Sequence, residues 1–64
     1  MITLNGRPAE ADGLTLAELL TRMEVPSRGV AVAVDAEVVP RGDWGERELH
    51  DGERVEILTA VQGG

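Results

Sequence analysis

A single short amphipathic segment, Leu16–Met23, constrains the fold more than any other part of this 64-residue chain. Its apolar side chains recur at helical spacing and predict one buried stripe on one helix, made of Leu16, Leu19, Leu20 and Met23. Thr15 and Glu18 form a capping box at the helix start, and Pro26 and Gly29 end the helix. A helix of about ten residues does not persist alone in water, so it needs a sheet to lie on.

Extended segments precede this helix. Met1–Leu4 alternates apolar and polar side chains, as a half-buried strand does. Asn5-Gly6 is a strong hairpin signal, because both positions of the tight turn need positive φ. Arg7–Ala11 is then the return strand. Pro8 has no N–H to donate to a neighbouring strand, so this strand is predicted to lie at the sheet edge.

Three more strands are predicted after the helix. Val30–Val34 has Val on one face and Ala on the other, which fits a strand whose Ala face is close to another element or a partner. Asp35-Ala36 turns the chain, and Glu37–Val39 returns. After a turn at His50-Asp51-Gly52, the last strand is Arg54–Val61. Alternation in that strand separates two sets of side chains, with Val55, Ile57, Thr59 and Val61 on one face and Glu56, Leu58 and Ala60 on the other.

The resulting order is β-β-α-β-β-β, which predicts an α+β fold with a mixed sheet of about five strands and one main helix packed on one face. The first and last strands can lie side by side at the centre, which is the β-grasp, or ubiquitin-like, arrangement. Residues 1–61 are expected to form this domain, and residues 62–64 a flexible C-terminal Gly-Gly tail. Trp44, the only aromatic residue, is expected to cover the open end of the core. The alternative for Trp44 is a partner contact.

Composition excludes several classes of function. Cys is absent, so disulfides, thiolate nucleophiles and Cys-ligated metals are excluded, and a cytoplasmic location fits. No apolar run reaches the roughly 18 residues that a membrane span needs, and no signal peptide is visible. Twelve acidic against 6 basic residues give a net charge of -6. This charge repels nucleic acid and anionic membranes and favours a partner with a basic docking surface.

The side chains offer little for catalysis, and we expect the chain not to be an enzyme and to bind no metal or cofactor. Ser27 and His50 are the only residues of their kinds, and their spacing does not indicate a triad. His50 is expected to be an exposed turn residue. Glu46 and Glu48 are expected to be solvated. The glycines form neither a dinucleotide fingerprint nor a phosphate loop with its lysine, so the chain should not bind ATP by itself.

The sequence ends in Gly63-Gly64, soon after the predicted last strand. A glycine pair at a free carboxyl end has no packing role, and the lack of Cβ atoms lets it thread into another protein's active site. The simpler interpretation is a frayed terminus. Because the rest of the chain has so little chemistry, the Gly64 carboxylate is the predicted working group, with Gln62 and Gly63 as its tail.

Five segments that cover nearly the whole chain match a known pattern: Leu16–Leu20, Gly29–Val34, Glu37–Arg41 with Trp44, Leu49–Leu58, and Val61–Gly64. Together they resemble the thiamine-biosynthesis sulfur carrier proteins, bacterial relatives of ubiquitin. The Val-Pro-Arg-x-x-Trp stretch that begins at Val39, taken with the terminal Gly-Gly, is fairly specific within the family of sulfur carriers.

The resemblance implies a carrier cycle. A partner adenylyltransferase, similar to ubiquitin-activating enzymes, consumes ATP and joins AMP to the Gly64 carboxylate. A persulfide from a sulfur-donor enzyme displaces AMP and leaves a thiocarboxylate, from which thiazole synthase takes the sulfur for the thiazole ring of thiamine. The chain is expected to be a monomer when free. Alternation and net charge place the expected docking surface near Leu58 and Ala60, with Glu56 at its rim.

Three alternatives remain open. The small subunit of molybdopterin synthase uses the same tail chemistry, but those chains are usually longer and contain Phe, which is absent here. A protein modifier joined to target lysines is the second. The absence of Lys speaks against chain building by such a modifier, but not against single attachment. The third is an interaction domain with an inert tail.

Overall fold

The computed structural model describes residues 1–26 and 28–59. Its elements are β1 (Ile2–Leu4), β2 (Arg7–Ala9), α1 (Leu16–Arg22), β3 (Val30–Val34), β4 (Glu37–Val39), the short 3-10 helix η1 (Arg41–Asp43) and β5 (Arg54–Thr59). The predicted order of strands and helix is confirmed. Ser27, Ala60 and Val61 lie outside the described residues, as do the predicted tail residues 62–64.

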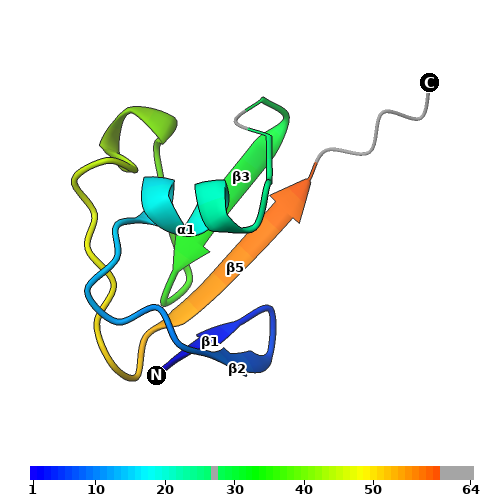
Figure 1. Ribbon diagram of the computed structural model, residues 1–64. Helices are drawn as coiled ribbons and strands as arrows, with labels where there is room; N and C mark the ends of the chain where they lie inside the picture. Colours follow the sequence, from blue (N-terminus) through cyan, green and yellow to red (C-terminus); the bar gives the residue numbers. More distant parts are fainter. Residues whose placement is uncertain (27, 60–64) are drawn as a thin grey trace.

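All five strands belong to one mixed sheet in the order β2-β1-β5-β3-β4. At its centre β1 and β5 run parallel, with Thr3 opposite Arg54, while the other neighbouring pairs are antiparallel. β2, which contains Pro8, lies at the edge as predicted. Figure 1 shows α1 lying across one face of this sheet, in front of β3 and β5. The β-grasp arrangement predicted from the sequence is therefore confirmed.

The predicted return strand Arg7–Ala11 is too long, because the strand ends at Ala9. The chain turns away from the sheet at Ala11, whose carbonyl accepts a hydrogen bond from the Leu14 N–H at 3.1 Å. Ala11 is 2% exposed and packs into the core. Ala11, two residues after the end of β2, is therefore part of the core and not of the sheet.

The start of α1 follows the prediction and its end does not. Thr15 Oγ1 accepts a hydrogen bond from the Glu18 N–H at 3.1 Å, and Glu18 Oε1 accepts one from the Thr15 N–H at 2.9 Å, which confirms the capping box. The helix has 7 residues instead of about ten. Glu24 has a positive φ of 58°, and the Val25 N–H donates a hydrogen bond to the Leu20 carbonyl at 3.0 Å. The helix therefore ends in a Schellman motif.

This early stop corrects the predicted buried stripe. Met23 caps the helix and is 40% exposed, so its assignment to the stripe is wrong. The other three members of the stripe are buried. The whole buried core is Ile2, Ala11, Leu16, Leu19, Leu20, Val32, Val34, Trp44, Leu49, Val55 and Ile57.

Trp44 covers the core as expected. It is 5% exposed, and its indole Nε1–H donates a hydrogen bond to the Val39 carbonyl at 2.9 Å. The ring therefore buries its apolar area and still satisfies its one polar atom. It is not available as part of an exposed partner surface.

Both predicted hairpin turns are present. Asn5 and Gly6 have φ values of 49° and 85°, as the hairpin signal predicted. Asp35 and Ala36 have φ values of 52° and 70°, so the second turn uses the same backbone geometry without a glycine. An alanine in this region is strained, because its Cβ crowds the backbone.

Candidate functional site

One face of the sheet carries α1, and the opposite face carries no helix within the described residues (Figure 1). We call this second side the outer face and define it by Ala31, Ala33, Val38, Glu56 and Leu58. The strand register brings these residues together, because Leu58 lies opposite Ala31 and Glu56 lies opposite Ala33. Directly opposed residues in a sheet point to the same side. Val38 joins them from β4, opposite Ala33.

The outer face is largely apolar and exposed. Val38 is 73% exposed and Leu58 is 69% exposed. Large apolar side chains that gather on one face, with a charged residue such as Glu56 at the margin, are typical of a protein-binding surface.

The outer face is also hollowed. A shallow cavity of about 120 Å³ is lined by Ala31, Val32, Ala33, Val38, Glu56 and Leu58. The hollow exists because the small alanine side chains of β3 lie between the larger ones of β4 and β5. A second shallow cavity of about 350 Å³ shares Ala31 and Leu58 and continues to Thr59. Together the two cavities extend from the outer face to Thr59, the last described residue of β5.

The predicted docking residues fall partly on this surface. Glu56 and Leu58 are exposed neighbours on the outer face, as alternation predicted. Ala60 lies outside the described residues, and so do Gln62, Gly63 and Gly64, so their roles stay predictions. Thr59 is exposed even though alternation places it on the side of Val55 and Ile57, because it lies at the end of the strand, beyond the core.

Sequence reasoning missed Val38 as part of this surface. Glu37-Val38-Val39 has two adjacent Val residues, so no alternation indicates which one faces outward. The register of β4 on β3 decides it, because Val38 pairs with Ala33. Ala31 and Ala33 lie where the Val-Ala alternation of β3 predicted, on the side opposite the buried Val32 and Val34.

Two turn residues bind the backbone of β5 through their side chains. Near the start of the strand, Asp35 Oδ1 accepts a hydrogen bond from the Arg54 N–H at 2.9 Å. Further along, Asn5 Oδ1 accepts one from the Ile57 N–H at 2.8 Å, and Asn5 Nδ2 donates to the Ile57 carbonyl at 3.3 Å. The strand that leads to the C-terminal segment is therefore held at two points by side chains.

Ionisable groups with shifted pKa values gather before β5, far from its outgoing end. Arg47 Nη2 lies 2.7 Å from Glu53 Oε2, and the His50 N–H donates to Glu53 Oε1 at 2.7 Å. The hydrogen bond from Arg47 is the main reason that the pKa of Glu53 is lowered. The same bond raises the pKa of Arg47. These groups stabilise the loop that enters β5.

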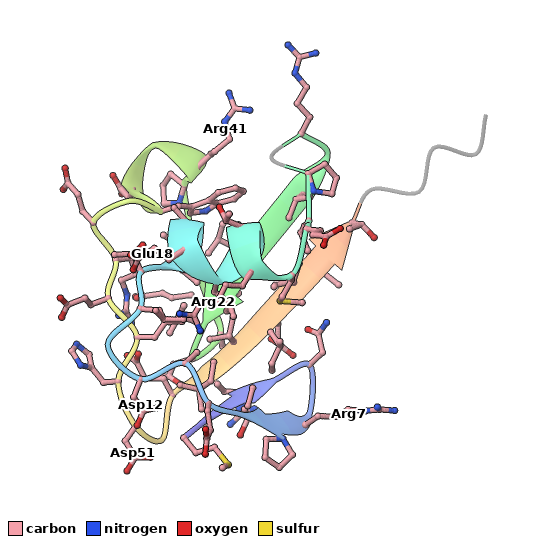
Figure 2. All side chains as sticks on the ribbon, in the orientation of Figure 1. Arg7, Asp12, Glu18, Arg22, Arg41 and Asp51 are labelled. Carbon is pink, nitrogen blue, oxygen red and sulfur yellow. The ribbon has the colours of Figure 1, made fainter. Side chains whose placement is uncertain are left out.

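A second charged cluster joins the Met1 ammonium to two carboxylates, Asp12 at 2.8 Å and Asp51 at 2.6 Å. Hydrogen bonding to these groups raises the pKa of the ammonium, and the ammonium lowers the pKa of Asp51. Figure 2 shows Asp12 and Asp51 near each other at the end of the molecule where β5 begins. This cluster links two loops at the end of the sheet opposite Thr59.

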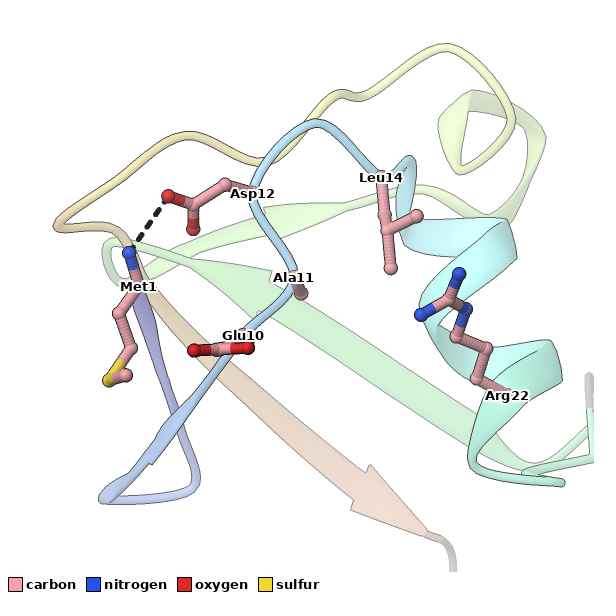
Figure 3. Close-up of a pocket in the computed structure, with 6 residues that line it drawn as sticks. All are labelled: Met1, Glu10, Ala11, Asp12, Leu14 and Arg22. Carbon is pink, nitrogen blue, oxygen red and sulfur yellow. Dashed lines mark hydrogen bonds and ion pairs between the residues drawn. The ribbon is translucent and has the colours of Figure 1, made fainter.

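A larger cavity, about 580 Å³, adjoins this cluster and is lined by Met1, Glu10, Ala11, Asp12, Leu14 and Arg22 (Figure 3). It is an open hollow of mixed charge between the loop after β2 and α1. Within residues 1–26 and 28–59, no group of three His, Asp or Glu side chains is arranged to hold a metal ion. His50 is exposed in its turn, as expected. The described part of the chain has no helix long and apolar enough to cross a membrane.

Comparison with known proteins gives the same family by three routes. The sequence model of the ThiS family matches residues 2–64. The sulfur carrier protein ThiS of Thermus thermophilus is 41% identical over 64 residues, which cover 100% of both chains. A crystal structure of a thiamine biosynthesis protein, ThiS from Geobacter metallireducens, superposes with a TM-score of 0.81 at 33% identity, covering 98% of this chain and 97% of that one.

A third relative has a different length. The thiazole synthase of Paramagnetospirillum magneticum is 31% identical over 64 residues, which are 98% of this chain but only 20% of that protein. The full-length match to the Thermus carrier and the family match over residues 2–64 decide the assignment. This β-grasp chain belongs to the ThiS family of sulfur carriers.

Proposed function

We propose that the Gly64 carboxylate of this sulfur carrier is converted to a thiocarboxylate and carries the sulfur in that form. We further propose that thiazole synthase accepts the sulfur. A partner adenylyltransferase supplies the activation. The Gly64 carboxylate attacks the α-phosphate of ATP, pyrophosphate leaves, and a glycyl adenylate forms. A carboxylate is a poor electrophile until one oxygen becomes a leaving group, and AMP provides that group.

Sulfur then replaces AMP. The terminal sulfur of a donor enzyme's persulfide attacks the acyl carbon of Gly64, and AMP leaves. A thiol cleaves the remaining S–S bond and is itself oxidised to a disulfide, which leaves the thiocarboxylate on the carrier. ATP is consumed by the partner, and the carrier itself catalyses no step and holds no cofactor. We place this cycle in the cytoplasm and propose that the free carrier is a monomer.

The observation that carries this proposal is the position of the outer face relative to the end of β5. The exposed apolar side chain of Leu58 and its hollow lie directly before Thr59. Five residues follow Thr59 in the sequence, ending in Gly63-Gly64. An extended segment of that length spans at most about 17 Å. A partner that covers the outer face can therefore receive Gly64 in an active site within that distance.

The match to a thiazole synthase supports the choice of acceptor. In the Paramagnetospirillum protein, a segment similar to nearly this whole chain is part of the same polypeptide that is named a thiazole synthase. A carrier-like segment attached to the acceptor enzyme raises its effective concentration there. We propose that this carrier reaches an acceptor of the same kind by docking through the outer face.

Deletion of Gly64 tests the proposal. Thiazole formation would be measured with the adenylyltransferase, ATP, the persulfide donor and thiazole synthase, using either the full chain or the chain lacking Gly64. Circular dichroism would confirm that both chains are folded. We expect the deletion to abolish product, because the acyl carbon that must reach both active sites is displaced by one residue.

Gln62→Ala is the matched control, since it changes a tail side chain and keeps the length and the terminal glycines. It is expected to retain most activity. Full activity of the deletion variant would contradict the proposal and favour an interaction domain with an inert tail. Sulfur transfer only to the large subunit of molybdopterin synthase would favour that pathway, and conjugation to target lysines would favour a protein modifier.

A further inference from the structure

The two strands at the centre of the sheet differ in length, and this leaves part of β5 without a neighbour. β1 ends at Leu4, which lies opposite Val55, whereas β5 continues to Thr59. On its other side β5 pairs with β3 from Val55 to its last described residue, Thr59. Beyond Val55, the edge of β5 that faces β1 has no strand to bond within the described residues.

The side chain of Asn5 fills the first vacant position on that edge. The Asn5 backbone N–H donates to the Val55 carbonyl at 2.9 Å, as the next ladder bond should. The side-chain amide then accepts from the Ile57 N–H at 2.8 Å and donates to the Ile57 carbonyl at 3.3 Å. A primary amide has the donor and acceptor of a peptide group, so it continues the ladder by one further residue.

The residue type and the backbone geometry agree with this arrangement. Asn5 has a φ of 49°, a region that Asn tolerates better than most residues. The turn directs the main chain into β2, away from β5, and leaves only the side chain beside Ile57. Ile57 is 8% exposed, and its neighbour Leu58 is the large apolar side chain that β5 exposes on the outer face.

We propose that Asn5 is a positioning residue for sulfur loading. Its amide holds the outgoing half of β5 in the plane of the sheet, so that Leu58 and Thr59 are presented in a fixed direction to the activating enzyme. Without it, the N–H and C=O of Ile57 bond to water, and residues 57–59 are held from the β3 side alone. The activity part of this inference rests on the proposed function, whereas the structural part does not.

Asp35 provides the matched control. It also has positive φ, at 52°, in a hairpin turn, and its carboxylate also bonds a backbone N–H of β5. Its partner is Arg54, at the start of the strand. Asn5→Gly and Asp35→Gly therefore each remove one side-chain anchor from β5 while glycine keeps the turn geometry.

Amide hydrogen exchange gives the readout that does not depend on function. In Asn5→Gly, the Ile57 N–H is expected to exchange about three to ten times faster relative to the Val32 N–H in the core. In Asp35→Gly, the faster exchange is expected at Arg54. Asn5→Asp keeps the acceptor for the Ile57 N–H but sets a carboxylate oxygen against the Ile57 carbonyl, so its Ile57 exchange should lie between wild type and Asn5→Gly.

Initial rates of Gly64 thiocarboxylate formation give the second readout. We expect kcat/KM to fall about three- to tenfold in Asn5→Gly and to stay near wild type in Asp35→Gly. Unchanged Ile57 exchange in Asn5→Gly would overturn the proposal, and so would equal rate losses in the two glycine variants. If wild type itself forms no thiocarboxylate, the proposed function fails, and the exchange data still decide whether Asn5 holds β5.

Discussion

The two sides of β5 show how one strand can serve both the fold and a partner. Val55 and Ile57 are 0% and 8% exposed and lie in the core beneath α1. Leu58, the next residue along, is 69% exposed on the outer face. Because side chains alternate along a strand, adjacent residues belong to different environments. Stability and docking should therefore respond to different substitutions.

The largest effect on the unfolding free energy is expected for a substitution in the core that α1 and β5 share. Leu16 is 0% exposed, and Leu16→Ala leaves a cavity beneath α1 that is expected to cost about 2–5 kcal/mol of unfolding free energy. A domain of this size has only a few kcal/mol of stability, so the variant should be largely unfolded at 37 °C. Urea denaturation followed by far-UV circular dichroism measures this. A loss below about 1 kcal/mol would contradict the packing described here.

A substitution on the outer face should leave stability unchanged and slow adenylation. Leu58→Glu is expected to change the unfolding free energy by less than about 0.5 kcal/mol, since the side chain is already in water. It should lower kcat/KM for adenylation at least tenfold, because burying a leucine at an interface contributes about 1.5–3 kcal/mol. Initial rates of adenylation at several carrier concentrations give this value.

Met23→Glu is the control for Leu58→Glu. It makes the same change of charge at an exposed apolar residue, but at the end of α1. Its adenylation rate should stay near wild type. Equal losses in both variants would mean that net charge, and not the outer face, governs docking.

The loop that enters β5 belongs to neither side and should show a smaller, pH-dependent effect. The pKa of Glu53 is lowered, chiefly by Arg47, so its stabilisation is present above the unfolded-state pKa near 4.5 and is lost as the pH falls through the folded-state pKa. Glu53→Gln should cost about 1 kcal/mol at pH 7.

The difference in unfolding free energy between wild type and Glu53→Gln should shrink as the pH falls below about 4.5. Taking this difference removes the contribution of Asp51, whose pKa is also lowered and which titrates in both chains. Urea denaturation from pH 7 to pH 3 gives the comparison. A difference that stays constant over this range would show that the ion pair with Arg47 is not its source.

The smallest effect is expected at the turn between β3 and β4. Ala36 has a φ of 70°, which glycine adopts without strain. Ala36→Gly should therefore raise the unfolding free energy by about 0.5–1 kcal/mol and the Tm by a few degrees. Adenylation should be unchanged, because the substitution alters neither side of β5. Differential scanning calorimetry checks the Tm, and an unchanged or lower value would contradict the strain.

Local signals predicted much of this fold. The Asn5-Gly6 turn, the capping box at Thr15 and the alternation through Val55 and Ile57 each depend on residues close in the sequence. The helix end was wrong at Met23, because the stop uses Glu24 at positive φ where a glycine would have signalled it. The predicted end of the strand at Ala11 was wrong as well. Both errors are at the ends of elements, where competing local geometries differ little in energy.

Contacts between distant segments could not be predicted in the same way. Leu49 is 0% exposed, although it lies in an irregular segment where no period marks it as core. The outer face was partly expected through Leu58, but the hollow beside it depends on the register of β3 and β4. The bond between Asn5 and Ile57 joins residues 52 positions apart and follows from the unequal lengths of β1 and β5.

The central claim, that Gly64 carries the sulfur, is tested most directly by mass spectrometry of the peptide Val55–Gly64, which trypsin releases by cleavage after Arg54. The carrier would first be incubated with the activating enzyme, ATP and a sulfide source. Replacement of oxygen by sulfur has the same nominal mass gain as oxidation of Met1 or Met23, but this peptide contains no Met. We predict a mass gain on the peptide and its reaction with a thiol alkylator. An unmodified peptide from folded carrier, with an activating enzyme of proven activity, would contradict the account.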